Sequence, residues 1–354
     1  MKTIWIVPIE PIDSRYTKQW YDNIPKLIGD RIGELELGPW EVRTIDGFQP
    51  SKGTTSGAFL DFATTNTYKA SQVQNIAGLF QDGIIKAGDK FLVTDAWNFA
   101  VTAIRYMSDL LDIPVEIHGI WHAGAYDPTD ILGMKMSKPW PHHQERAWYY
   151  ACDYNYYATN FHRSMFLTNL NIPYADTTRA IRSGQPHTPI VEALEGYFHD
   201  AKDGSIIWPH RYNADKQPEI AEDLAKDLDL VITSKLGLSK DKYYKTMGKA
   251  SAIFSCALHE NLGISVMEAV LAGAIPIVPD RASYAEMYLP EFKYPSVWTS
   301  SWENYEAYKT KLEDFILERV QNREQYKDAL LSQFYILYAQ YLQPTIMIDK
   351  LLDV

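Results

Sequence analysis

The sequence predicts an α/β protein made of two doubly wound domains. Short apolar segments alternate with helical patterns along most of the chain, which is typical of parallel sheets covered by helices. The clearest example lies at residues 252–278, where a strand, a polar loop, a helix and a buried strand follow one another directly. A chain of 354 residues is long enough for two such domains, each with its own core.

The expected strands are runs of apolar residues that end in polar or glycine-containing loops. They cover residues 2–9, 40–44, 90–94, 114–117, 152–160, 205–208, 229–233, 252–255 and 274–278. The expected helices show apolar residues at spacings of three and four. They cover a segment that ends at residue 28 and residues 67–87, 141–150, 161–170, 218–227, 238–247, 264–271 and 320–352, the last one broken at Pro344.

Glycine and proline mark the boundaries between these parts. Gly273 directly follows the helix at 264–271 and is expected to end it. The sequence IRSGQPHTP at 181–189 is dense in glycine and proline, and we place the linker between the domains there. The predicted domains are residues 1–185 and residues 186–328, followed by a C-terminal helix at 329–354.

Composition excludes several classes of protein. The 46% hydrophobic and 22% charged content is that of a soluble globular protein. The chain has no run of about twenty apolar residues, and its start lacks the apolar core of a signal peptide, so we expect a cytoplasmic protein without a membrane span. The net charge of −11 argues against overall attraction to nucleic acid, although it leaves room for a local basic groove. Cys152 and Cys256 are expected to be free buried thiols.

Aromatic residues are plentiful, and many of them stand in polar surroundings. The chain contains 24 Tyr and 10 Trp. Exposed aromatic rings can stack on sugars or bases, although most aromatic residues of any protein belong to its core or its rim. The helix at 238–247 is expected to carry an exposed tyrosine pair, Tyr243 and Tyr244.

Two glutamates and a glycine give the segment around 260 its chemical character. Glu260 lies in the loop before a helix, and Glu268 lies on that helix. About two turns of helix bring Glu268 roughly to the side on which the loop lies. The amides near Gly263 and Ile264 stand at the helix N-terminus, where partial positive charge collects. A phosphate would be held by these amides, and hydroxyl groups would meet the two glutamates.

On these residues, and on the Glu-Ala and Gly-x-x-Pro-Ile-Val that follow, the segment resembles the large family of retaining, nucleotide-sugar-dependent glycosyltransferases of GT-B fold. In that family the first glutamate contacts sugar hydroxyls, the amides of the glycine loop contact sugar and phosphate, and the second glutamate binds the ribose. The resemblance assigns these roles to Glu260, Gly263 and Glu268. The chain departs from the pattern at Asn261 and Leu262, where a small residue and an aromatic are usual, and this leaves the accepted sugar open.

The resemblance also implies the architecture and a pair of cations. A GT-B protein has two Rossmann-like doubly wound domains that face a central cleft, and its C-terminal helix crosses back to the first domain. Arg211 and Lys216, between the first strand and the first helix of the second half, match the family's diphosphate-binding pair. Two fixed cations would stabilise the charge of the leaving nucleoside diphosphate. The expected donor-binding residues are Arg211, Lys216, Glu260, Asn261, Leu262, Gly263, Ile264 and Glu268.

Two histidines follow a strand of the first half, at the edge where ligands of open α/β sheets bind. In the resembled family a histidine at this place contacts the donor sugar from the first domain. We favour His118, because the pattern places it directly at the strand end, and His122 is the alternative. The expected catalytic residues are therefore His118, Glu260, Arg211 and Lys216.

The loops of the first half supply candidates for binding the acceptor. The expected acceptor residues are Asp13, Arg15, Tyr16, Asp61, Asp95 and His122. The alternative for the loop after the first strand is that its polar residues only cap the helix that follows.

The resemblance implies sugar transfer from a nucleotide-diphosphate sugar to an acceptor hydroxyl with retention of configuration. A phosphate oxygen of the leaving group would take the acceptor proton. No cofactor is expected, and a UDP-sugar is the favoured donor. No metal site is expected either, since Arg211 and Lys216 would do the work of a metal ion.

The acceptor is open. The first half is rich in aromatic residues and poor in glycine, and it contains the loop sequences SRYTKQW (14–20) and GAFLDF (57–62). On these features it resembles the glycosyltransferases of tailed phages, some of which modify hydroxymethylated pyrimidines in phage DNA, and this would place the protein in the host cytoplasm. Such an enzyme would need to reach the base and would need a cationic groove. Candidates for the groove are Lys18, Lys52, Arg146 and Arg163. The alternatives are a glycan, a lipid-linked sugar or a small metabolite as acceptor, or a nucleotide-sugar epimerase of the same fold.

Overall fold

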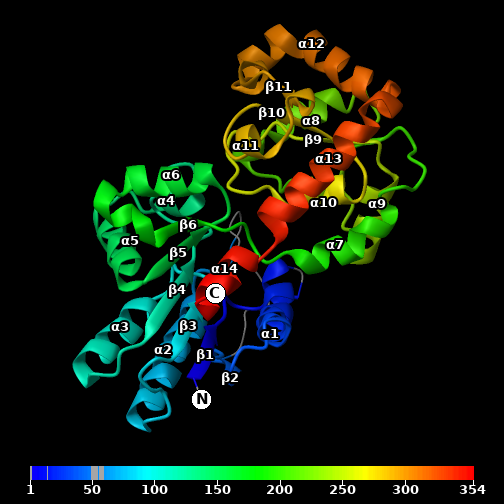
Figure 1. Cartoon of the computed structure of the whole chain (residues 1–354). Coiled ribbons are helices and arrows are strands. Elements are labelled where there is room, and N and C mark those ends of the chain that lie inside the picture. The colour runs from blue at the N-terminus through cyan, green and yellow to red at the C-terminus, as the bar shows by residue number, and fades with distance from the viewer. Residues whose placement is uncertain (1, 14, 49–54, 56–59) are drawn as a thin grey trace. The chain divides into compact units, whose positions relative to one another are not determined.

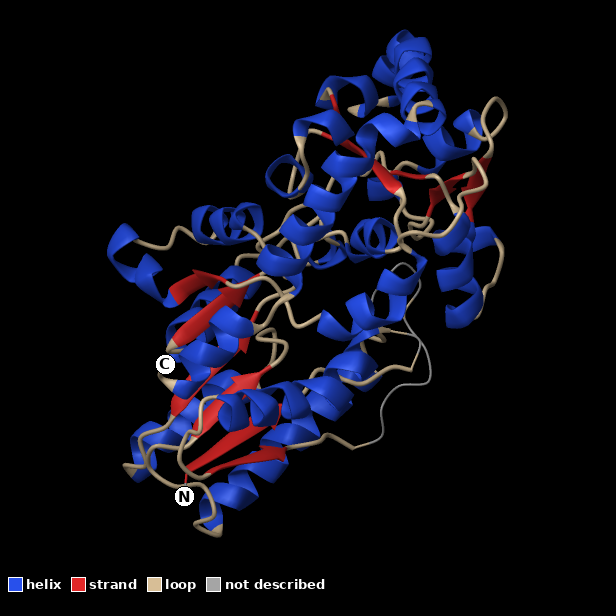
Figure 2. Cartoon of the chain, turned by 45° about the vertical axis from the view of Figure 1, so that its right-hand side comes forward, coloured by secondary structure: helices blue, strands red, loops and turns tan. Residues whose placement is uncertain are grey.

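The computed structural model describes residues 2–13, 15–48, 55 and 60–354. The chain forms two compact units, one of Met1–Pro186 with Pro344–Val354 and the other of His187–Gln343. Each unit contains a parallel sheet covered by helices (Figures 1 and 2). The prediction of two doubly wound parallel-sheet α/β domains is therefore confirmed.

Unit 1 contains a sheet with the strand order β2-β1-β3-β4-β5-β6, in which every pairing is parallel. Its strands are β1 (Lys2–Val7), β2 (Trp40–Thr44), β3 (Lys90–Val93), β4 (Glu116–Ile120), β5 (Tyr154–Tyr157) and β6 (Ala180–Arg182). The order reverses between β1 and β3. In open α/β sheets this switch point, at the carboxyl ends of the strands, is where ligands bind.

The two faces of this sheet carry separate cores, because successive residues of a strand point to opposite sides. Trp5 and Val7 of β1 belong to one core cluster, while Ile4 and Ile6 belong to the other. The second cluster also includes residues of the last helix, such as Leu351. This helix therefore packs on the sheet of unit 1, where Figure 1 shows it in red beside α1.

The described helices of unit 1 connect or cover these strands. They are α1 (Tyr16–Glu34), α2 (Thr64–Gln81), α3 (Ala100–Leu111), α4 (Ile131–Lys135), α5 (Trp140–Ala151), α6 (Asn160–Asn169) and α14 (Thr345–Leu352). Arg31 of α1 holds α14 through two hydrogen bonds to Asp349, of 2.8 and 3.1 Å.

Unit 2 contains a parallel sheet with the strand order β11-β10-β9-β7-β8. Its strands are β7 (Ile206–Trp208), β8 (Leu230–Ile232), β9 (Ala252–Phe254), β10 (Ile275–Pro279) and β11 (Lys293–Tyr294). The order reverses between β7 and β9. The loops after these two strands therefore meet at the switch point of unit 2.

The described helices of unit 2 connect or cover its strands and end at Leu342. They are α7 (Thr188–Leu194), α8 (Pro218–Leu224), α9 (Lys240–Lys249), α10 (Ile264–Leu271), α11 (Tyr284–Met287), α12 (Trp302–Gln321), α13 (Lys327–Leu337) and a π-helical turn at Tyr338–Leu342.

Several elements differ from the sequence prediction. The helix expected at 320–352 is divided into the end of α12, α13, the π turn and α14, and only α14 lies in unit 1. The helices α3 and α12 were not expected, and β6 follows the strand that was taken as the last of the first half. The spacing of Ala100, Val101 and Ile104, which are buried on one face of α3, was present in the sequence and was overlooked. In α12 the buried face is marked by only three residues, Tyr305, Leu312 and Ile316, along a helix of 20 residues.

Candidate functional site

A lysine and a glutamate join the two loops at the switch point of unit 2. Lys216 lies in the loop after β7 and Glu260 in the loop after β9. The Nζ atom of Lys216 lies 2.7 Å from Oε2 of Glu260 and 2.7 Å from the carbonyl oxygen of His259. It also lies 3.0 Å from Oδ2 of Asp215. The three donor positions of this ammonium group are thus all directed at oxygen atoms of the site.

The charges of this pair support each other. Burial opposes the charged form of both groups, but the attraction between them is stronger. The pKa of Lys216 is therefore raised by Glu260 and Asp215, and the pKa of Glu260 is lowered by Lys216. His210, behind the pair, is buried and hydrogen-bonded to Ser255, and burial together with the nearby Lys216 lowers its pKa to about 3. The site at neutral pH thus holds an ionised Lys–Glu pair beside a neutral imidazole.

Gly263 allows the backbone to turn from the loop into α10. Its φ of +76° lies in the left-handed region, which side chains disfavour. A Cβ atom there would lie 2.7 Å from Cε1 of Tyr284 and 3.2 Å from Cγ of Glu260. The glycine therefore lets the N-terminus of α10 approach the carboxylate. The amides of Val266 and Met267 bond to the Gly263 carbonyl. The preceding amides, at Ile264 and Ser265, stand in the first turn, where helix N–H groups have no partner within the helix.

Glu268 lies on α10, and α9 packs against this helix. The hydroxyl of Tyr244 donates to Oε1 of Glu268 over 3.2 Å, and the hydroxyl of Tyr243 donates to Oε2 over 3.5 Å. Burial raises the pKa of Glu268 to about 7, although Lys240 and the two tyrosines favour its charged form. The expected exposure of the tyrosine pair is wrong: Tyr244 is buried and Tyr243 is partly buried.

The other predicted donor residues lie around this turn. Leu262 is buried, while Asn261 and Ile264 are partly exposed on either side of the glycine turn. Arg211 is exposed in the loop after β7, and within the described ranges no hydrogen bond or ion pair occupies its guanidinium group. The structure thus brings Lys216 and Glu260 into contact, and it leaves Arg211 available to an anion.

Unit 1 has a polar cluster at its own switch point. His122 follows β4, and its Nε2 lies 2.7 Å from the carbonyl oxygen of Thr94, which follows β3. Since a carbonyl only accepts, Nε2 carries the proton, and Nδ1 of the neutral ring accepts from the hydroxyl of Tyr16 over 3.1 Å. Burial lowers the pKa of His122, so the neutral ring is the form at pH 7. Trp20 packs against the imidazole with ring centroids 5.0 Å apart.

The other predicted acceptor residues differ in their surroundings. Asp95 is buried beside the cluster and forms an ion pair of 2.8 Å with Lys69. Asp61 accepts hydrogen bonds from the amides of Ala63 and Thr64 and thereby caps α2; the Thr64 bond is the main reason that its pKa is lowered. Asp13 is exposed, and Arg15 is partly exposed at the start of α1.

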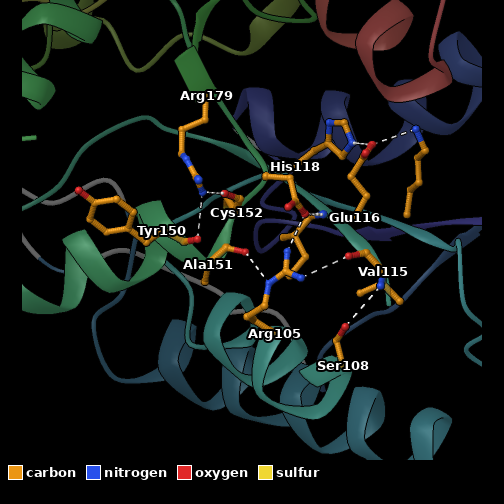
Figure 3. A network of polar contacts seen from close by, with 12 residues as sticks. Arg105, Ser108, Val115, Glu116, His118, Tyr150, Ala151, Cys152 and Arg179 are labelled. Atoms are coloured by element: carbon orange, nitrogen blue, oxygen red, sulfur yellow. Dashed lines mark hydrogen bonds and ion pairs between the residues drawn. The ribbon is translucent and has the colours of Figure 1, made fainter. Parts of the chain in front are cut away.

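The position predicted for His118 is wrong. His118 lies inside β4, where it is fully buried on the face of the sheet that α14 covers. Its Nε2 lies 2.7 Å from Glu116 and its Nδ1 lies 2.8 Å from the hydroxyl of Tyr156. Figure 3 shows the ring beside Glu116, in a network that ties neighbouring strands together. The sequence pattern placed the strand end too early, at residue 117, whereas β4 continues through Gly119 to Ile120.

Two of the four residues proposed for a cationic groove form polar contacts within unit 1. Lys18 forms an ion pair with Asp22 on α1. Arg163 donates to the carbonyl of Ala180 over 2.8 Å. Arg146 lies on α5, and Lys52 falls outside the described residues. The groove therefore stays a prediction.

Other sequence expectations concern cysteines, metals and membranes. Cys152 and Cys256 are free and buried, as predicted, and burial raises the pKa of Cys256 to about 12. In residues 2–13, 15–48, 55 and 60–354, no three His, Cys, Asp or Glu side chains gather as metal ligands would. Across the same ranges, every helix is too short or too polar to cross a bilayer.

Solved structures with this arrangement of elements include sugar-transferring enzymes. A lipopolysaccharide outer core galactosyltransferase, WaaB, matches with a TM-score of 0.54 over 99% of this chain and 98% of its own, at 9% sequence identity. A sucrose-phosphate synthase from Thermosynechococcus elongatus matches with a TM-score of 0.53 over 96% of this chain and 99% of its own, at 12% identity. The fold is the one found in GT-B glycosyltransferases.

The same fold also occurs in other enzymes of nucleotide sugars. A putative UDP-N-acetylglucosamine 2-epimerase from Listeria monocytogenes matches with a TM-score of 0.50 over 99% of this chain and 94% of its own, at 13% identity. No protein-family model matches the sequence. A curated relative, the tRNA-queuosine alpha-mannosyltransferase of Drosophila melanogaster, is 29% identical over an alignment of 125 residues, which covers 27% of this chain and 33% of that protein. The match thus spans about a third of the relative.

Sequence reasoning missed two residues at the site. Asp215 directly precedes Lys216, and it could have been noticed as a carboxylate beside the lysine in the loop after β7. Tyr284 lies beneath the glycine turn and bonds to Ser255 over 3.3 Å. No sequence signal links Tyr284 to Gly263, because the contact depends on how the loop after β10 folds back.

Proposed function

We propose that the chain is a retaining glycosyltransferase that moves a sugar from a nucleoside-diphosphate sugar to an acceptor hydroxyl. The observation that carries this proposal is the joining of Lys216 and Glu260 at the switch point of unit 2, next to the glycine turn that starts α10. Positive charge, amide donors and a carboxylate acceptor at one strand edge are the groups that a sugar diphosphate requires.

The donor is proposed to bind along this edge. The amides at the start of α10 and the exposed Arg211 would hold the diphosphate. Glu260 would accept hydroxyl groups of the sugar, and Glu268 would accept those of the ribose. A UDP-sugar is the favoured donor. We propose that no cofactor or metal ion is needed, because Arg211 and Lys216 provide the positive charge.

The chemical step replaces one bond at the anomeric carbon. The bond from that carbon to the diphosphate oxygen breaks, and a bond from the same carbon to the acceptor oxygen forms on the same face. The acceptor proton passes to an oxygen of the leaving phosphate. Arg211 would stabilise the charge that develops on this leaving group, and Lys216 would do so once one of its N–H groups turns from Asp215 to a phosphate oxygen.

We propose a hydroxyl group on a modified nucleobase as the acceptor, with Tyr16 and His122 among the residues that bind it. The name of the Drosophila relative describes transfer of mannose to tRNA-queuosine, which supports an acceptor of this kind. The resemblance of the first half to phage enzymes suggests hydroxymethylpyrimidine DNA as a second nucleic acid to test. In either case the action would take place in the cytoplasm, which is the host cytoplasm for a phage enzyme.

An epimerase is the second candidate, because the epimerase structure from Listeria monocytogenes covers nearly the whole chain. An epimerase converts the donor itself and needs no acceptor. A glycosyltransferase with a glycan, lipid-linked sugar or small-metabolite acceptor would instead release nucleoside diphosphate without labelling nucleic acid.

The test is mass spectrometry after incubation with a panel of UDP- and GDP-sugars and three nucleic acids: bulk tRNA, hydroxymethylpyrimidine DNA and plain DNA. The proposal expects a hexose or pentose mass on tRNA or on the modified DNA only, and no product from a Glu260→Gln variant. An isomerised donor without transfer would replace the proposal with the epimerase. Intact donors throughout the panel would contradict both.

A further inference from the structure

The carboxylate of Glu268 is hydrogen-bonded to two tyrosines, and its proposed role in ribose binding does not explain these bonds. Tyr244 and Tyr243 are neighbours on α9, and each donates its hydroxyl to a different oxygen of Glu268. The ring centroids of the pair are 6.0 Å apart. A glutamate that only accepts ribose hydroxyls needs no partner from the protein. In Glu268, by contrast, each carboxylate oxygen accepts a tyrosine hydroxyl.

The geometry points to Tyr244 and Tyr243 as positioning residues of the ribose subsite, which hold Glu268 so that its remaining lone pairs accept the hydroxyls of a bound nucleoside diphosphate sugar. An ionised carboxylate has about four acceptor sites, and the two tyrosines occupy two of them. Glu268 is partly exposed, and we place the ribose hydroxyls at the other two acceptor sites. This inference rests on the proposed function of the donor site.

Tyr244 contributes more than Tyr243. Its bond is shorter, at 3.2 against 3.5 Å, and its side chain is buried, so its position is fixed by packing. Lys240 lies over its ring, with Nζ 5.3 Å from the centroid. A fixed hydroxyl of this kind orients a carboxylate at little entropic cost, because its own rotamer is already chosen.

The arrangement makes donor binding depend on the ionisation of Glu268. Tyrosine hydroxyls and ribose hydroxyls both donate, so a carboxylate that accepts from all of them must be ionised. Burial raises the pKa of Glu268 to about 7, while Lys240, Tyr244 and Tyr243 lower it. These three groups lie on α9. Of the other elements packed on α10, namely α7, α13, β9 and β10, none contributes a charged group to this balance within the described residues.

The test measures the affinity for UDP-glucose and for GDP-mannose by calorimetry between pH 5.5 and 8.5. The diphosphates of these donors do not titrate in this range, so the protein alone supplies the pH dependence. The wild type should bind about ten times more tightly at pH 8 than at pH 6, as a required ionisation near pH 7 dictates. Tyr244→Phe should weaken binding at pH 7 by about 3- to 10-fold and move the midpoint to higher pH, because a donor to the carboxylate is lost. Tyr243→Phe should do the same to a smaller degree.

The matched control is Tyr305→Phe, which removes another tyrosine–carboxylate bond of unit 2, the 2.8 Å bond to Asp223. It should lower stability and leave the pH midpoint of binding unchanged. A wild-type midpoint and affinity in Tyr244→Phe would overturn the inference. If neither donor binds the wild type, the proposed donor site fails, and the carbon-13 NMR titration of Glu268 decides the positioning role separately. An equal midpoint in the wild type and in Tyr244→Phe would then overturn it.

Discussion

Lys216 and Glu260 form an ion pair of 2.7 Å between the loops that follow β7 and β9. Only 9% of the lysine side chain and 20% of the glutamate side chain are exposed, so water screens the pair weakly. The pair links the two loops of the switch point, which makes the local fold and the proposed chemistry depend on the same contact.

Breaking this pair should therefore cost stability as well as donor binding. We expect Lys216→Met to lower the free energy of unfolding by about 3 kcal/mol, because it leaves a largely buried carboxylate without its partner. Urea denaturation measures this cost. Lys309→Met, which removes a lysine 2.8 Å from Asp223 at a more exposed position, is the control and should cost no more than about 1 kcal/mol.

The double variant Lys216→Met with Glu260→Gln tests whether the lost stability comes from the unpaired charge of Glu260. It should recover part of the stability lost by Lys216→Met, since no buried charge is then left unpaired. Strictly additive losses would show that the two residues do not interact in solution.

Gly263 should be harder to replace than a glycine whose Cβ position is open. Gly263→Ala meets both the strain of a positive φ and the contact with Tyr284, so we expect a loss of about 2–4 kcal/mol and loss of donor binding. Gly237→Ala is the matched control. Its φ is +56° and a Cβ atom there meets nothing within 4 Å, so it should cost only about 1 kcal/mol. Thermal unfolding of both variants compares the two costs, and equal losses would remove the contact with Tyr284 as a cause.

The ionisation of Glu268 should make the stability of the protein fall as the pH rises. Its pKa is about 7 in the folded chain and about 4.5 in the unfolded chain, so the folded state binds more protons between these values. The wild type should lose up to about 3 kcal/mol from this group between pH 4.5 and pH 8. Glu268→Gln should lack this loss and be more stable than the wild type at pH 8, relative to their difference at pH 5. Urea denaturation of both proteins at pH 5 and pH 8 measures this. A difference in unfolding free energy that does not change with pH would contradict the raised pKa of Glu268.

Arg211 should contribute to donor binding and not to the fold. It is exposed, so Arg211→Ala should leave the unfolding free energy within about 0.5 kcal/mol of the wild type. The affinity for a nucleoside diphosphate should fall by about 10- to 100-fold, the value of one or two charge-assisted hydrogen bonds. Calorimetry with UDP and GDP measures this. Lys226→Ala, which changes an exposed lysine in the turn after α8, should have no such effect. Equal affinities of Arg211→Ala and wild type would exclude Arg211 from the site.

Tyr16 should contribute to turnover with the acceptor but not to the affinity for the donor. Tyr16→Phe removes the hydrogen bond to His122 at the switch point of unit 1, so turnover with an acceptor should fall while donor affinity stays unchanged. Tyr21→Phe, which removes a bond of 3.0 Å to Asp46 from the same helix, is the control and should retain turnover. Full turnover in Tyr16→Phe would exclude Tyr16 from binding the acceptor.

The sequence predicted the elements of the second half of the chain well and those of the first half less well. The strand, glycine turn and apolar helix at 252–271 could be read directly, because Gly263 and the buried face of α10 leave few alternatives. His118 could not be placed, since the sequence HGIW does not show where β4 ends. Its burial follows from the strand period and from α14, which lies far away in the sequence.

The tyrosine pair shows a second limit. The helix at 238–247 was expected to carry Tyr243 and Tyr244 as an exposed pair, yet both hydroxyls donate to Glu268 on another helix. Asp61 shows the reverse case, because an acid that could have bound a ligand instead caps the helix that follows it. In both cases the partner decides the role of the residue, and single-sequence patterns do not contain the partner.

The most direct test of the donor site is a crystal structure of the protein with UDP or GDP, whichever binds more tightly. We expect a phosphate oxygen within about 3 Å of the amide nitrogens at the start of α10, with the ribose hydroxyls on Glu268 and Arg211 turned toward the diphosphate. A nucleotide bound away from the Lys216–Glu260 pair, or in unit 1 alone, would contradict the account.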